Sequence, residues 1–155
     1  MGYSSRGAEA QGIFKWHVTN SRATYSPNYV ALDGTWTIVS HVASHGGQLL
    51  SNETTHQLND EVALGGFYVP TAAAYTAYMI LSTGSDSGEI HININGTDTG
   101  TIDGYAASGA SNVIKSVSLG TLTVGAKSVS IDVADKNASS SNYYANIQAL
   151  FIAED

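Results

Sequence analysis

The sequence predicts an all-β protein, an antiparallel jelly-roll β-sandwich with an extended N-terminal arm. Only 12% of its 155 residues are charged, about half the usual share, and no long helical pattern is present. Short alternating segments recur instead, separated by clusters of Gly, Ser, Asn and Asp. In "GEIHININGTDTGTID", Ile90, Ile92 and Ile94 alternate with polar residues. The Asn95-Gly96 pair that follows predicts a hairpin turn, because both central residues of a type I′ turn need positive φ.

The elements divide the chain into two parts. Residues 1–28 have weak periodicity and are expected to form an extended arm or a first strand around "IFKWHV". Residues 29–155 are expected to form the sandwich, with turns at Asp33-Gly34 and Gly125-Ala126. Its candidate strands are 29–32, 35–42, 48–51, 62–69, 74–83, 89–94, 99–103, 113–120, 127–134 and 143–153. The alternation predicts an inward-facing set made of Ile90, Ile92, Ile94, Val129, Ile131, Val133, Ile147 and Phe151.

Composition excludes several classes of function. A net charge of −7 with six scattered Lys and Arg residues argues against nucleic acid as a partner, because such binding needs clustered basic side chains. The chain has no cysteine, so neither a disulfide framework nor a thiolate metal site is expected. The N-terminus lacks the apolar region of a signal peptide, and no apolar run has membrane-spanning length. We therefore expect a chain made in the cytoplasm that does not act at a membrane.

The segment from Gly66 to the C-terminus resembles known jelly-roll domains. It combines a strand ending in Val-Pro, the aromatic strand "AYTAYMIL", the "GEIHINING" hairpin followed by Asp-Gly-Tyr, and the strand "LTVGAKSVSIDV". A Ser-rich loop and the apolar strand "YYANIQALFI" complete the pattern. This arrangement is similar to carbohydrate-binding modules of the galactose-binding-like group. It is equally similar to jelly-roll domains of bacteriophage structural proteins, in tail fibres and capsid decoration proteins.

The resemblance to carbohydrate-binding modules implies one candidate calcium site. These modules usually hold calcium between N-terminal acidic residues and a late Asp beside the final strand. Asp135 corresponds to that late Asp, and Glu9 is the only N-terminal partner, in a segment with no matching motif. The sequence itself therefore predicts no metal ion and no cofactor.

Histidines and carboxylates give no catalytic or metal motif. His41 and His45 are four residues apart, a useful spacing only on a helix, and they precede Gly-Gly at the end of a strand. His91 shares a strand face with Glu89 and Asn93, which we interpret as a polar cross-strand ladder on the wet side of a sheet. No nucleophile elbow, phosphate loop or H-E-x-x-H sequence is present. We expect no catalytic residues and therefore no enzyme.

Aromatic side chains are the better indication of function. Nine tyrosines and two tryptophans accompany only three phenylalanines, and tyrosine brings a large contact area with a polar tip. The arm carries too little apolar surface to fold alone. Its aromatic residues are therefore the candidate partner-binding set: Tyr3, Phe14, Trp16 and Tyr25. On the sandwich, the candidate glycan-binding residues are Trp36, Tyr78 and Tyr144.

These features lead to two functional hypotheses beside an unrecognised enzyme. The main hypothesis is a virion accessory protein, a trimeric capsid decoration protein whose arm docks on a capsid or other virion protein while the jelly-roll projects outward. Its localisation would be the virion. The alternative is a carbohydrate-binding module or a receptor-binding fibre domain, with a glycan as the partner. Sequence features alone leave both open.

Overall fold

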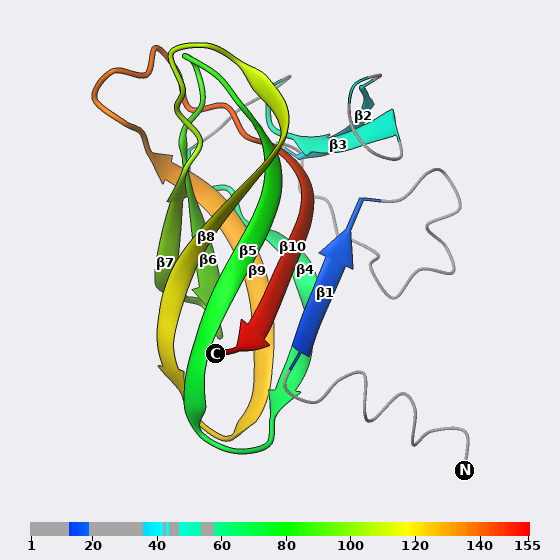
Figure 1. Ribbon diagram of the computed structural model, residues 1–155, viewed down its shortest axis with the longest axis vertical. Helices are drawn as coiled ribbons and strands as arrows, with labels where there is room; N and C mark the ends of the chain where they lie inside the picture. Colours follow the sequence, from blue (N-terminus) through cyan, green and yellow to red (C-terminus); the bar gives the residue numbers. More distant parts are fainter. Residues whose placement is uncertain (1–12, 19–35, 42, 44–46, 54–57) are drawn as a thin grey trace.

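The structure is a computed structural model that describes residues 13–18, 36–41, 43, 47–53 and 58–155. Within these ranges all regular elements are strands (Figure 1). They are β1 (Ile13–His17), β2 (Thr37–Ser40), β3 (Gln48–Ser51), β4 (Val62–Val69), β5 (Ala73–Thr83), β6 (Glu89–Ile94), β7 (Thr97–Asp103), β8 (Ala110–Leu122), β9 (Gly125–Asp135) and β10 (Asn146–Glu154). No helix in this part of the chain is long and apolar enough to cross a membrane.

The strands form two antiparallel sheets packed as a β-sandwich, as the sequence predicts. A six-stranded sheet has the order β2-β3-β10-β5-β8, and β1 pairs with β10 beside β3. A four-stranded sheet has the order β4-β9-β6-β7. We call these the large sheet and the small sheet. At the two sides of the sandwich β1 contacts β4 and β7 contacts β8, so the edges of the two sheets cover one another.

The core lies between the sheets and contains nearly all of the predicted inward-facing residues. Ile90, Ile92 and Ile131 have no exposed surface, and Ile94, Val129, Val133 and Ile147 are also buried. The predicted turn is confirmed, since Asn95 and Gly96 have φ values of 52° and 79°. Alternation with a period of two therefore identifies the buried face of β6 and β9 correctly.

The prediction is wrong for Phe151, which lies on the outer face of the large sheet and is only half-buried. A β-bulge in β10 is the reason: Ile147 pairs with Leu81 but Ala149 pairs with Ile80, so Gln148 is an extra residue. An extra residue reverses which side chains face the core beyond it. Leu150 and Ile152 consequently face inward with no exposed surface.

Two of the N-terminal aromatic residues, Phe14 and Trp16, belong to the sandwich itself. β1 pairs with β10 over its whole length, and it directs Phe14 and Trp16 into the core, where they are 4% and 0% exposed. Phe14 contacts the Phe67 ring of β4 at a centroid distance of 6.1 Å. This corrects the prediction that Phe14 and Trp16 anchor the chain on a neighbouring protein, because neither side chain is accessible. Tyr3 and Tyr25, the other members of that set, lie outside the described residues.

The polar face of β6 lies on the outside of the small sheet and forms a cross-strand ladder. Asn93 is buried and its Nδ2 donates to Asp132 Oδ1 at 2.8 Å. His91 Nδ1 lies 3.4 Å from Asp98 Oδ2 on β7. Side-chain pairs of this kind stabilise neighbouring strands, so Asn93 and His91 have a structural role in the small sheet.

Candidate functional site

A pocket of about 520 Å³ opens at one end of the large sheet. Its floor is a row of three paired residues, Ser51 of β3, Asn146 of β10 and Ser82 of β5. The next row, Leu50, Ile147 and Leu81, is buried in the core, so the first row belongs to the outer face of the sheet. The rest of the lining comes from β2, β3, the end of β5, the start of β8 and the residues that adjoin these strands: Val39, Ser40, His41, Leu49, Glu53, Thr83, Asp86, Ser87, Gly109, Ala110 and Ser111.

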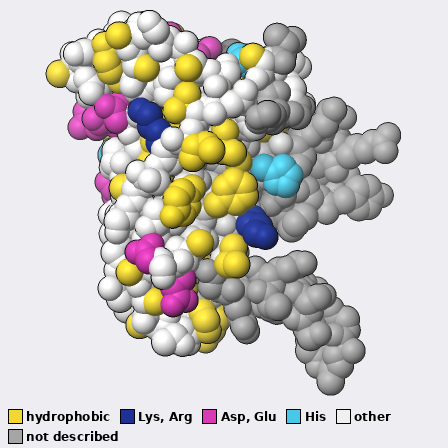
Figure 2. All heavy atoms as spheres, viewed as in Figure 1, with side chains coloured by type: hydrophobic (Ala, Val, Ile, Leu, Met, Phe, Trp, Pro, Cys, Tyr) yellow, Lys and Arg dark blue, Asp and Glu magenta, His cyan; other side chains and the backbone are white. Residues whose placement is uncertain are grey.

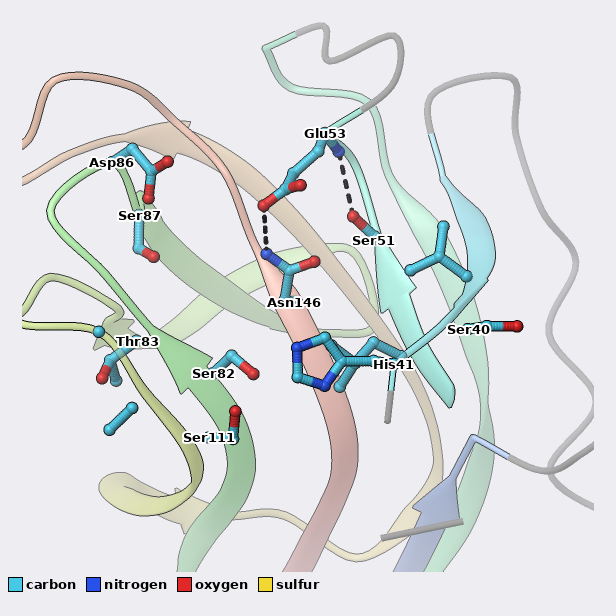
Figure 3. A pocket seen from close by; sticks show the side chains of 14 residues that line it. Ser40, His41, Ser51, Glu53, Ser82, Thr83, Asp86, Ser87, Ser111 and Asn146 are labelled. Atoms are coloured by element: carbon cyan, nitrogen blue, oxygen red, sulfur yellow. Dashed lines mark hydrogen bonds between the residues drawn. The ribbon is translucent and has the colours of Figure 1, made fainter. Parts of the chain in front are cut away.

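Hydrogen bonds fix one side of the pocket. Glu53 Oε1 accepts from Asn146 Nδ2 at 2.7 Å, and the Glu53 backbone N–H donates to Ser51 Oγ at 3.2 Å (Figure 3). The remaining lone pairs of the Glu53 carboxylate can still accept hydrogen bonds. In Figure 3, the Glu53, Asn146, Ser82 and His41 side chains surround the opening, while Ser40 points away from it.

Asn52 holds this side of the pocket to the rest of the fold. It is 1% exposed. Its Oδ1 accepts from the Ala145 backbone N–H at 2.7 Å, and its Nδ2 donates to the Tyr143 carbonyl at 3.1 Å. These bonds tie the end of β3 to the loop before β10, and so position Ser51, Glu53 and Asn146 together.

Ser82 Oγ is buried and has no hydrogen-bond partner among the described residues. A buried hydroxyl group without a partner costs about 1–3 kcal/mol. Ser82 lines the pocket, so a polar ligand that enters could supply the missing bond. The pocket thus combines hydroxyl, amide and carboxylate groups that both donate and accept hydrogen bonds.

An apolar strip follows the pocket on the same face of the large sheet. It consists of Ile80 and Tyr78 on β5, Phe151 on β10 and Ile114 on β8. Tyr78 pairs with Phe151, and Ile80 pairs with Ile114. Ile114 and Tyr78 are 68% and 44% exposed. Large apolar side chains that gather on an exposed surface usually mark a binding site. Figure 2 shows hydrophobic side chains concentrated in the middle of this face, beside a histidine and a lysine.

The pocket and the strip form one continuous surface. Ser82, Ile80 and Tyr78 alternate on the same face of β5, with the intervening Leu81 and Met79 buried in the core. At about 3.3 Å per residue, Ser82 and Tyr78 lie roughly 13 Å apart. A ligand longer than the pocket would therefore extend over the aromatic part of the strip.

The three predicted glycan-binding residues lie in three different environments. Tyr78 lies exposed on the apolar strip, in agreement with its predicted position on the surface. Trp36 is 1% exposed and its Nε1 donates to the Asp60 carbonyl at 3.0 Å, so its selection as a contact residue is wrong. Tyr144 is half-buried beside the pocket, with its backbone N–H donating to the Asp86 carbonyl at 3.1 Å, but it does not line the pocket.

Each candidate pair of metal ligands has one member outside the described residues. Within the described ranges no group of three or more His, Asp and Glu side chains is arranged to hold a metal ion. His41 lines the pocket, whereas His45 and Glu9 lie outside the described residues. Asp135 is exposed and its Oδ1 accepts from the Lys136 backbone N–H.

Sequence reasoning missed most of the pocket. Glu53, Ser111, Asn146 and the neighbouring residues Ser82 and Asp86 come from four segments that are far apart in the chain and share no motif. Of these residues, Ser82 alone could be placed from the sequence, because it continues the alternation that puts Tyr78 and Ile80 on the outer face of β5. The other residues become neighbours only through the pairing of β3, β10 and β5.

Comparison with solved structures relates this fold to carbohydrate-binding domains. The sequence matches no family model and no curated protein. A carbohydrate-binding module of Cellvibrio mixtus lichenase 5A, in complex with cellotriose, matches with a TM-score of 0.60 and 11% identity, over 83% of this chain and 98% of the module. The C-terminal CBM6 of the Zobellia galactanivorans laminarinase LamC matches with a TM-score of 0.56 and 15% identity, over 92% and 99%.

Larger enzymes match only over a small part of their length. Paenibacillus xanthan lyase has a TM-score of 0.62 and 20% identity, but the match covers 91% of this chain and only 13% of the lyase. Structures matched over nearly their full length are thus carbohydrate-binding modules. The fold resembles theirs, and none of these matched structures is a virion protein, so they give no support to the virion hypothesis.

Proposed function

We propose that this chain is a non-catalytic carbohydrate-binding domain that holds an oligosaccharide on the outer face of its large sheet. The observation that carries this proposal is the continuity of the polar pocket with the exposed apolar strip. Sugar rings have hydroxyl groups around their rim and C–H groups on their faces. The pocket offers hydrogen-bond partners for the rim, and Tyr78 with Phe151 offers a surface for the C–H face.

The likeness in fold to carbohydrate-binding modules supports this proposal at the level of ligand class. The matched module from Cellvibrio mixtus lichenase 5A was solved with cellotriose. Short β-linked glucans are therefore suitable first probes, and short β-mannans are added because a Podospora anserina GH26-CBM35 β-(1,4)-mannanase also matches in fold. The distance of about 13 Å between Ser82 and Tyr78 suits a chain of several sugars better than a single sugar.

The test measures the binding of β-1,4-glucan, β-1,3-glucan and β-1,4-mannan oligosaccharides by isothermal titration calorimetry. We expect one of them to bind, and Tyr78→Ala to weaken that binding by at least about fivefold, because truncation of a contacting aromatic residue typically costs more than 1 kcal/mol. Tyr68→Ala is the matched control. Tyr68 is 41% exposed but lies on β4 in the small sheet, so its replacement should leave binding unchanged.

Two outcomes would contradict the proposal. One is the absence of binding across a broad glycan array with a correctly folded protein. The other is glycan binding that Tyr68→Ala weakens and Tyr78→Ala does not, which would move the site to the small sheet. Thermal unfolding of both variants should be similar, because both side chains are exposed to a similar extent.

A further inference from the structure

We infer that the pocket selects uncharged glycans and rejects those that carry carboxylate or sulfate groups. This inference rests on the proposed function and deepens it by naming the class of ligand. It depends on the charges around the pocket, because the described lining contains two carboxylates and no lysine or arginine.

Two carboxylates face the same opening. Glu53 lies after β3 and Asp86 lies in the segment between β5 and β6, and both line the pocket (Figure 3). Glu53 is oriented by its bond from Asn146 Nδ2, so it cannot turn away without losing that bond. The described lining contains no lysine or arginine. An anionic sugar would therefore meet two like charges.

The lysines of the described chain do not compensate for these charges. Lys115 Nζ donates to the Asp103 carbonyl, Lys127 Nζ donates to Thr123 Oγ1, and Lys136 Nζ donates to the Ser140 carbonyl. Each of these bonds holds its lysine at a position that does not line the pocket.

Lys15 is exposed on β1 beside the apolar strip, where it pairs with Phe151. Phe151 pairs with Tyr78 and Asn146 pairs with Ser82, so Phe151 and Asn146 lie about 13 Å apart along the sheet. That separation exceeds the screening length of about 8 Å at physiological ionic strength. Lys15 therefore cannot neutralise Glu53 and Asp86 for a sugar seated in the pocket.

Neutral sugars do not meet this barrier and gain from the same carboxylates. A sugar hydroxyl can donate to a carboxylate oxygen, which is a charge-assisted hydrogen bond and stronger than a neutral one. A uronate or sulfate group has no proton to donate at neutral pH and is repelled instead. Juxtaposed like charges suppress the binding of a wrong partner in this way.

The experiment compares oligosaccharides that differ only at C6. Cellotetraose is paired with its C6-carboxylate counterpart, a β-1,4-linked glucuronate tetramer, and mannotetraose is paired with the β-1,4-linked mannuronate tetramer. Affinities are measured by titration calorimetry at about 20 mM and 300 mM salt. For the pair whose neutral member binds, the carboxylated member should bind at least about tenfold more weakly at low salt. The difference should shrink at high salt, because salt screens repulsion between accessible charges.

Variants assign the discrimination to the pocket. Glu53→Gln with Asp86→Asn keeps the size of both side chains and removes two negative charges, so the ratio of neutral to anionic affinity should fall at least about threefold. Asp98→Asn with Asp135→Asn is the matched control. It removes the same charge from β7 and β9 of the small sheet and should leave the ratio unchanged.

The outcomes separate this inference from the proposed function. If neutral and anionic members bind the wild-type protein equally well, or if both double variants change the ratio alike, charge selection by the pocket is wrong while glycan binding stands. If neither member of any pair binds and a wider glycan array is also negative, the proposed function is wrong and the inference falls with it.

Discussion

Replacement of Asn52 by alanine should lower the free energy of unfolding by about 2–4 kcal/mol. The side chain is 1% exposed and satisfies the Ala145 N–H and the Tyr143 carbonyl. Alanine would leave both backbone groups without their partner. Each buried group that loses its bond costs about 1–3 kcal/mol, and water can reach the half-buried Tyr143 more easily than Ala145.

Urea unfolding followed by intrinsic fluorescence measures this loss, and Asn146→Ala is the comparison. Asn146 also donates a side-chain hydrogen bond, to Glu53, but that bond is exposed, so its loss should cost less than about 1 kcal/mol. Asn52→Ala should in addition weaken glycan binding, since it frees the segment that carries Glu53 and Asn146. An Asn52→Ala protein within 1 kcal/mol of wild type would refute the argument that this residue joins β3 to the loop before β10.

Two further predictions concern the core. Tyr75→Phe should leave stability unchanged or raise it by up to about 1 kcal/mol at pH 7, because the buried Tyr75 hydroxyl has no partner among the described residues. Burial, and to a lesser extent the charge of Glu154, raise the pKa of Tyr75 above its ordinary value of 10.0. The stability of the wild-type protein should therefore fall as the pH rises beyond 10. Denaturant unfolding at pH 9 to 11 should show a smaller loss for Tyr75→Phe. Leu150→Ala should cost about 2–5 kcal/mol and Phe151→Ala clearly less, because only Leu150 faces the core; the reverse order in urea unfolding would argue against the bulge at Gln148.

The sequence predicts the sandwich well because its main signal is local. The isoleucines of β6 and the valines of β9 alternate without interruption, and burial of one face explains both strands. The same rule fails at Phe151, since a single extra residue at Gln148 reverses the pattern and leaves no mark in composition. The sequence predicts strands around Phe14, Trp16 and Trp36 but not the burial of these side chains, because their partners, such as Phe67 and Asp60, come from distant segments.

The candidate site is less predictable for a geometric reason. The exposure of Tyr78 can be predicted because the alternation of its neighbours on a regular strand shows which face it occupies. Glu53, Asp86 and Asn146 lie on segments separated by tens of residues and meet only when β3, β10 and β5 pair. Isolated Ser, Asn and Asp residues between strands are common in any β-sandwich, so their convergence becomes visible only in three dimensions.

The central claim is that a glycan binds the outer face of the large sheet, and amide chemical-shift mapping tests it most directly. An isotope-labelled sample would be titrated with the tightest-binding oligosaccharide. We expect the largest shift changes at Ser82, Asn146 and Tyr78 and at their neighbours on β5 and β10, with little change on β4, β6, β7 and β9. Saturable changes confined to the small sheet, or no changes at any glycan concentration, would contradict the claim.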